Sequence, residues 1–202
     1  LVIGLFGALL TTIVSMMFAA FGVWFGGWAD SLVQRVTEAN MIMPVVAIAV
    51  LFYAFYGVDL WTILTVIVIL NAFGGPTKTF RAAFLQVKEA GYIEAAQAYG
   101  APNRRIIFRY MIPRILPVLI PQLVTLIPGF IFLEATLGMF NVQSVMPTWG
   151  KVIYEALYHG AAWGSKFWVL EPIALLLLTG FAFSMMGFAL DRVLNPRLQQ
   201  GD

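Results

Sequence analysis

Long apolar runs, separated by short segments rich in glycine, proline and charge, constrain this chain more than any other feature. The first run extends from Leu1 to Val23, and an α-helix of that length crosses the hydrocarbon core of a bilayer, about 30 Å thick. Of the 202 residues, 61% are apolar and 11% are charged, whereas soluble domains have about 45–50% and about 25%. Because a backbone in lipid must satisfy its own hydrogen bonds, the sequence predicts an all-α, polytopic membrane protein. The five predicted transmembrane helices comprise residues 1–23, 44–56, 60–73, 115–139 and 167–190.

An amphipathic stretch precedes the second apolar run. Gly26-Gly27 is expected to end the first helix, and Asp30 or Ser31 to cap the next one. We expect this helix to lie at the membrane interface and to turn at Pro44 into the second span, because proline interrupts a helix. Its apolar face is predicted to comprise Leu32, Val36 and Ala39.

The fourth run carries three prolines, which predict kinks that are either static or allow bending during gating. These are Pro117, Pro121 and Pro128. Beyond this run, residues 140–167 are predicted to form a loop with a short helix from Trp149 to Tyr158.

The basic residues predict the orientation. Residues 78–114 form a polar segment with seven of the twelve Lys and Arg residues. With five spans, this segment lies on the same side of the membrane as Arg35, Arg192 and Arg197, so this side has ten basic residues. The other side has two, Lys151 and Lys166. The positive-inside rule makes residues 78–114 and the C-terminus cytoplasmic and residues 140–167 extracytoplasmic. The first residue is then outside, so we expect the chain to be N-terminally truncated and to lack a preceding span.

The polar segment has three predicted parts. Lys78 to Val87 extends the third helix into the cytoplasm. Tyr92 to Tyr99 forms a short helix with Tyr92, Ala96 and Tyr99 on one face, ended by a left-handed Gly100. Asn103 is expected to cap a basic amphipathic helix at the lipid headgroups. The short helix either sits in a groove on a cytoplasmic protein or is part of an ordinary cytoplasmic loop.

A resemblance to a known family bears on whether the short helix docks on another protein. Glu94-Ala95-Ala96, three residues, Gly100 and then Tyr110-Met111-Ile112-Pro113 resembles the EAA loop of ABC importer permeases. Tyr110 and Ile112 differ from the general pattern, while its spacing is intact. The stretches 25–31, 92–96, 104–109, 134–135, 147–150 and 191–198 are similar to the C-type subunit of the oligopeptide/dipeptide/nickel permease family, whereas 137–140 departs from it.

The resemblance implies a type I ABC importer permease fold, with residues 1–202 as a single permease domain. The five spans would correspond to the second to sixth of the family's six. It also implies a prokaryotic inner-membrane location, a paralogous permease partner, two cytoplasmic ATPase subunits and an extracytoplasmic solute-binding protein. ATP would be bound by the partner ATPases, with no cofactor in this chain.

The implied solutes are peptides, with nickel and oligosaccharides among relatives. The residues expected to dock on the ATPase are Tyr92, Glu94, Ala95, Ala96, Tyr99, Gly100, Arg104 and Pro113.

Three polar residues inside apolar runs are candidates for the translocation path. Asn71 and Gln122 could line a cavity or could instead hydrogen-bond between helices. Glu134 could line the path or could pin the outer loop from its position near the outer interface.

Other classes of function find little support in the residues. Gly150-Lys151 lacks the upstream glycine and the hydroxyl of a phosphate-binding loop. The chain has no cysteine and one histidine, which excludes a Cys-based or His-rich metal site. The sequence also contains no recognisable set of catalytic residues, which disfavours a membrane enzyme. We expect no nucleic-acid partner. The alternative to a permease subunit is a stand-alone secondary transporter or channel, which would predict several buried charges at mid-membrane.

Overall fold

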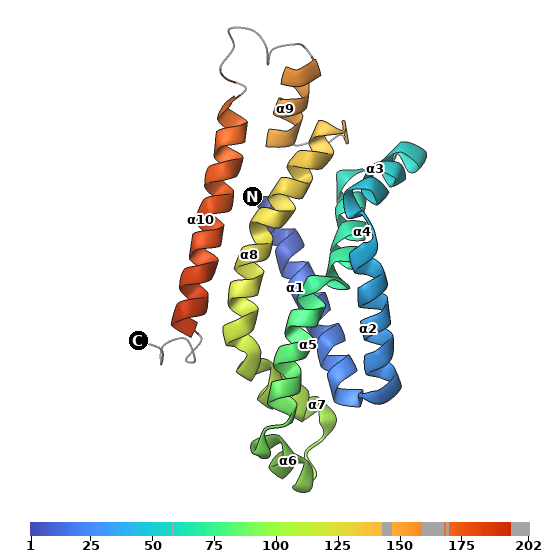
Figure 1. Cartoon of the computed structure of the whole chain (residues 1–202), viewed down its shortest axis with the longest axis vertical. Helices are drawn as coiled ribbons and strands as arrows, with labels where there is room; N and C mark the ends of the chain where they lie inside the picture. The colour runs from blue at the N-terminus through green and yellow to red at the C-terminus, as the bar shows by residue number, and fades with distance from the viewer. Residues whose placement is uncertain (58, 143–146, 159–167, 169, 195–202) are drawn as a thin grey trace.

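The computed structural model describes residues 1–57, 59–142, 147–158, 168 and 170–194, and the regular secondary structure of this part is entirely helical (Figure 1). The elements in chain order are α1 (Val2–Phe25), α2 (Gly27–Ile42), α3 (Val45–Tyr56), α4 (Leu60–Ala72), α5 (Gly75–Lys88), α6 (Gly91–Ala98), α7 (Asn103–Arg105), the π-helix η1 (Ile106–Met111), α8 (Ile112–Met139), α9 (Trp149–Tyr158) and α10 (Leu170–Leu194). The prediction of an all-α fold is confirmed.

The helices account for the predicted spans. Four stretches are long and apolar enough to cross a membrane, namely Val2–Phe25, Leu60–Lys88, Asn103–Met139 and Leu170–Leu194. α2 and α3 make a fifth if they count as one span, and they meet at 77°. The bend falls at Pro44, as predicted, because proline has no amide hydrogen to continue the helical ladder. α9 begins and ends at the predicted residues, and 143–146 and 159–167 of the predicted outer loop lie outside the described residues.

α1 lies in the middle of the bundle and contacts α2, α4, α5 and α8 (Figure 1). Its buried side consists mostly of small residues. A Cβ atom on Gly4 or Gly7 would come within 2.5 Å of a side chain of α8, Ile131 or Phe130. Large side chains of α1 are exposed, among them Leu5, Phe6, Leu9 and Ile13. In lipid this arrangement is favourable, because close packing of small residues, rather than removal of apolar surface from water, brings the helices together.

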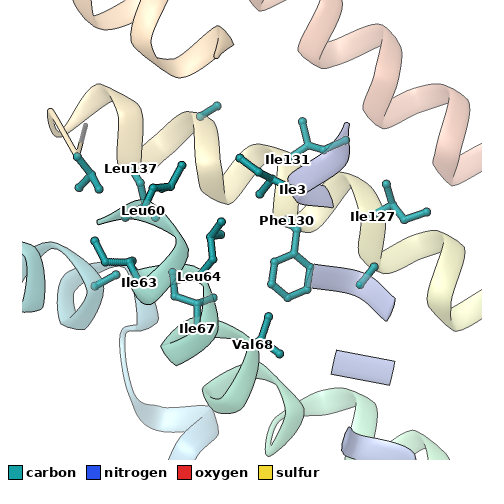
Figure 2. Close-up of a cluster of buried hydrophobic side chains, with 14 of the residues drawn as sticks. Ile3, Leu60, Ile63, Leu64, Ile67, Val68, Ile127, Phe130, Ile131 and Leu137 are labelled. Carbon is teal, nitrogen blue, oxygen red and sulfur yellow. The ribbon is translucent and has the colours of Figure 1, made fainter. Parts of the chain in front are cut away.

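An apolar core joins α4 to α1 and α8 (Figure 2). Because much of the outer surface of the bundle is also apolar, this core specifies how three helices interlock rather than separating apolar from polar surface. Its labelled members are Ile3 of α1, Leu60, Ile63, Leu64, Ile67 and Val68 of α4, and Ile127, Phe130, Ile131 and Leu137 of α8.

α2 differs from its prediction in two ways. It begins at Gly27, before the expected caps, and it lies along α1 and α5 instead of across the end of the bundle (Figure 1). The predicted apolar face of Leu32, Val36 and Ala39 is exposed on the outside of the bundle, where lipid can cover it. The buried face is instead Val33, Thr37 and Asn40. Lipid accepts the large apolar side chains, so the residues that hydrogen-bond inside the protein turn inward.

The helices on either side of α6 are longer than predicted. α5 extends α4, as expected, but Phe80 and Phe84 are fully buried and α5 packs on α1 and α8, so α5 is part of the bundle. The expected headgroup helix is continuous with the fourth span, since 103–139 form one helical stretch through η1. α8 continues through Pro117, Pro121 and Pro128.

Candidate functional site

α6 lies at one end of the bundle, beyond the ends of α5 and α8, and α9 lies at the other end (Figure 1). The loop that contains α6 connects α5 to α7 and thus joins two bundle helices. α6 is therefore the described element that projects furthest from the bundle at this end.

Ile93 attaches α6 to the bundle. Its side chain is 0% exposed, and Ala96 packs partly buried against the same cluster. The cluster also contains Phe80 and Phe84 of α5 and the helical residues Ile106, Met111 and Ile115. The sequence analysis missed Ile93 as the anchor, although it is the large aliphatic residue three positions before Ala96, where one helical face repeats.

The two tyrosines of the predicted face point away from the bundle, as residues expected to dock on another protein must. Tyr92 is 44% exposed and Tyr99 is 92% exposed, so only Ala96 of the predicted trio faces the bundle. Glu94 and Ala95 are exposed beside them. The resulting free surface carries one carboxylate, small residues and two tyrosines.

The C-terminus of α6 is a Schellman motif. The amide of Gly100 donates to the carbonyl of Gln97 at 2.9 Å, and the amide of Ala101 donates to that of Ala96 at 3.0 Å. Gly100 has φ +74°, in the left-handed region that glycine adopts without a Cβ penalty. Its predicted role as the helix stop is confirmed. The prediction that Asn103 caps the next helix is off by one residue, since Pro102 is the N-cap of α7.

The remaining predicted docking residues lie close by in the chain. Tyr92 and Pro113 line one depression at the base of α6, so the structure brings these two together. Arg104 is exposed in α7, immediately after the turn that follows α6. Tyr92, Glu94, Ala95, Gly100 and Pro113 are likewise exposed, so these predicted residues are accessible on the surface.

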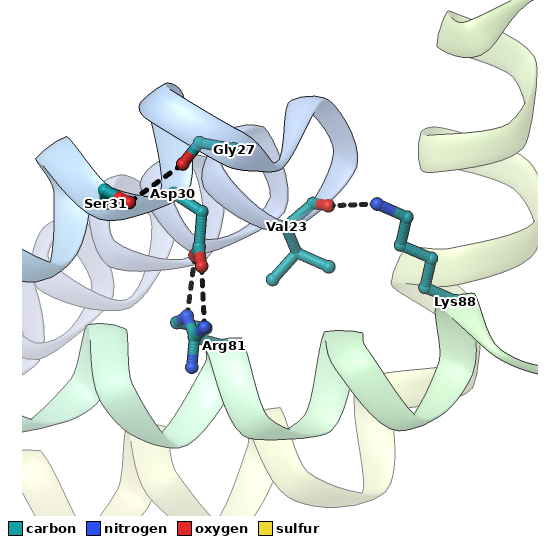
Figure 3. A network of polar contacts seen from close by, with 6 residues as sticks. All are labelled: Val23, Gly27, Asp30, Ser31, Arg81 and Lys88. Atoms are coloured by element: carbon teal, nitrogen blue, oxygen red, sulfur yellow. Dashed lines mark hydrogen bonds and ion pairs between the residues drawn. The ribbon is translucent and has the colours of Figure 1, made fainter.

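A polar tie holds α5 to the turn between α1 and α2 (Figure 3). Arg81 of α5 forms a bidentate ion pair with Asp30 of α2, with Nε–Oδ1 2.7 Å and Nη2–Oδ2 2.6 Å. Lys88 donates to the carbonyls of Val23 and Trp24 at 2.6 and 3.2 Å and so satisfies the C-terminus of α1. These contacts were not predicted from the sequence. The only signal was that Asp30 lies within residues 25–31, one of the stretches that resemble the permease family.

The three candidate path residues are not brought together. Gln122 and Glu134 are twelve residues apart in α8, about 18 Å along the helix. Asn71 donates to Ile67 of its own helix at 3.0 Å, so the expected bond between helices is not the one that it makes. Asn40 makes such a bond instead, to the carbonyl of Leu70 at 2.5 Å.

Glu134 lies where α8 meets the segment that leads into α9. It is 7% exposed, and the Thr148 side chain hydrogen-bonds to it. Nearby, a Cβ atom on Gly150 would come within 2.6 Å of the Ala135 carbonyl oxygen, so α9 touches the α8 backbone. These contacts favour a structural role for Glu134, holding the outer segment in place, over a role in the translocation path.

Comparison with known proteins identifies the family. The family described as binding-protein-dependent transport system inner membrane component matches residues 11–200. The chain is similar to dipeptide transport system permease protein DppC of Bacillus subtilis, 26% identical over 99% of the chain and 62% of the relative, and to that of Alkalihalophilus pseudofirmus, 32% identical over 87% and 58%. It is also similar to oligopeptide transport system permease protein OppC of Haemophilus influenzae, 27% identical over 98% and 63%.

The chain spans about three fifths of the length of these relatives. The family match covers nearly all of the chain and agrees with the helical bundle and with the apolar spans. This chain belongs to the family of binding-protein-dependent transport system inner membrane components, and it has that family's type I importer permease fold.

Proposed function

We propose that this chain is the permease subunit of an ABC importer for peptides or related solutes, with nickel and oligosaccharides as further possibilities for the solute. The observation that carries the proposal is α6, a short helix outside the bundle whose Glu94, Ala95 and Gly100 are exposed while Ile93 fastens it to bundle helices. The names of the relatives, which are dipeptide and oligopeptide transport permeases, support the solute class.

α6 is the coupling helix in this proposal. Its small exposed residues allow the backbone of an ATPase subunit to come close, while Glu94 and the tyrosines supply polar and aromatic contacts. ATP is bound by that subunit and not by this chain. When the ATPases close, α6 moves with them, and the Ile93 cluster and the Asp30–Arg81 pair pass the movement to α1, α2, α5 and α8. The rigid packing favours a switch between two states of the bundle over a gradual deformation.

The partners and the orientation follow from the same proposal. A paralogous permease subunit supplies the other half of the translocation path. Asn71 and Gln122 are candidate contributors to the path, while Glu134 holds the outer segment in place. A solute-binding protein docks at the extracytoplasmic end, where α9 lies. The end with α6, and the C-terminus, face the cytoplasm, supported by the ten basic residues assigned to that side.

A charge reversal tests the docking. We expect Glu94→Lys in the assembled transporter to abolish substrate-stimulated ATP hydrolysis and uptake, because the carboxylate lies on the surface presented to the ATPase. Glu89→Lys is the matched control, since Glu89 is an exposed carboxylate five residues earlier, outside the helix. Full transport by Glu94→Lys, with the complex intact, would show that α6 does not dock on an ATPase. Ion-driven uptake by the purified chain without any ATPase would favour a stand-alone transporter.

A further inference from the structure

The depression at the base of α6 carries an unusual set of side chains. It has a volume of about 450 Å³ and is lined by Tyr92, Arg109, Tyr110, Pro113 and Arg114. Two guanidinium groups thus share a space with two phenol rings.

The two arginines have no anionic partner among the described residues. Arg35 pairs with Glu38 and Arg81 with Asp30, and neither arginine of the depression belongs to these pairs. Between Tyr92 and Arg114 the sequence holds four arginines and one carboxylate, Glu94. The depression therefore has excess positive charge and the capacity for several charge-assisted hydrogen bonds to an anion.

The π-helix η1 explains how Arg109 reaches the surface. Ile106 and Met111 are both fully buried although they are five residues apart, a spacing that would point them in different directions on an α-helix. The wider π-turn lets both side chains enter the core, which leaves Arg109 and Tyr110 between them to line the depression.

The depression also lies where an apolar outer surface begins. Along α8, Leu116 and Ile120 are exposed within two turns after Arg114, as expected for a helix that faces lipid. Tyrosine is enriched at membrane interfaces, and arginine there keeps its stem in the apolar region and its head among the headgroups. Charge, aromatic residues and position thus all match the headgroup layer.

We propose that this depression binds the phosphate of an anionic phospholipid, with Arg109 and Arg114 as its ligands and the two tyrosines against the glycerol region. The lipid lies against the helix that leads out of α6 and so becomes part of the support of α6. The proposal needs only that the chain lies in a membrane. Tyr92 and Pro113 are shared with the surface proposed to dock on the ATPase, whereas the two arginines that bind the phosphate are not.

Native mass spectrometry of the detergent-purified full-length protein tests the site. We titrate it with dioleoyl phosphatidylglycerol and, separately, with dioleoyl phosphatidylcholine, and measure the apparent Kd of the first bound lipid. A direct charge-assisted hydrogen bond from an arginine to the lipid phosphate contributes about fivefold or more to the affinity. Arg109→Gln/Arg114→Gln is therefore expected to weaken phosphatidylglycerol binding about 25-fold, while Arg109→Lys/Arg114→Lys keeps most of it.

The control is Arg104→Gln/Arg105→Gln, which removes the same charge from the same helical stretch but outside the depression. It should weaken binding less than about threefold, since only the long-range attraction is lost. Equal weakening by both pairs, or equal affinity for the two lipids, would overturn the site. Displacement of the lipid by millimolar inorganic phosphate would identify a free anion as the ligand instead. If Arg109→Gln/Arg114→Gln detaches the ATPase while lipid affinity is unchanged, the depression is a protein contact and the proposal is wrong.

Discussion

Replacing Ile93 with alanine separates the attachment of α6 from the stability of the bundle. Ile93 is fully buried among residues of α5, η1 and α8, and α6 otherwise adds only the partly buried Ala96 to that cluster. Truncation of a fully buried isoleucine costs about 2–5 kcal/mol. Because α6 is eight residues long and lies outside the bundle, this loss should appear as local detachment of α6 rather than as unfolding of the bundle.

Hydrogen exchange measures that detachment. A loss of 2 kcal/mol or more raises the population of the detached state about 30-fold or more, and the α6 amides should exchange faster by the same factor. Exchange in α1 and α8 should not change. In the assembled transporter the detached helix should also lower the number of substrates moved per ATP hydrolysed.

Two variants calibrate the result. Ile93→Val removes one methyl group and should accelerate exchange only about 2- to 12-fold, from about 0.5–1.5 kcal/mol. Tyr99→Ala removes a side chain that is 92% exposed and should leave exchange unchanged. Unchanged α6 exchange in Ile93→Ala, or an equal increase in α1 and α8, would refute the reasoning that Ile93 is a local anchor.

Three further predictions concern single contacts. Gly100→Ala should destabilise the end of α6 by about 1–2 kcal/mol, because Gly100 has a φ of +74°, and the amides there should exchange faster. Gly91→Ala should not have this effect, because Gly91 has equally open surroundings but no positive φ. A double-mutant cycle on Asp30→Ala and Arg81→Ala should give a coupling of about 1–2 kcal/mol in thermal unfolding, and additive single effects would contradict the ion pair. Gly150→Ala should lower the stability by about 1–3 kcal/mol in the same assay, because its Cβ would lie 2.6 Å from a backbone oxygen, and an unchanged melting temperature would disprove that contact.

The sequence was sufficient for features that depend on local chain properties. The spans follow from run length and apolarity, and both are measured along the chain itself. The bend at Pro44 and the stop at Gly100 follow from the backbone chemistry of those residue types. The order of the helices and the existence of α6 were predictable for the same reason.

The buried face of each helix was not predictable in this way. On α2 the residues that pack inside the bundle are Val33, Thr37 and Asn40, and on α6 the residue that packs against the bundle is Ile93, and none of these was predicted. In water, apolarity marks the inner face, whereas lipid removes that contrast, so burial there depends on which residues fit against a neighbouring helix.

Contacts between distant residues were decided by the tertiary structure alone. Asp30 and Arg81 are 51 positions apart, and Lys88 reaches the end of α1 across 65 positions, so no local pattern pairs them. The sequence by itself determined the positions of the four long apolar spans, the existence of the short helix α6 and its stop at Gly100. Only the tertiary structure decided that α6 rests on Ile93 and that α5 is tied to the α1–α2 turn, because those contacts arise from how the helices pack.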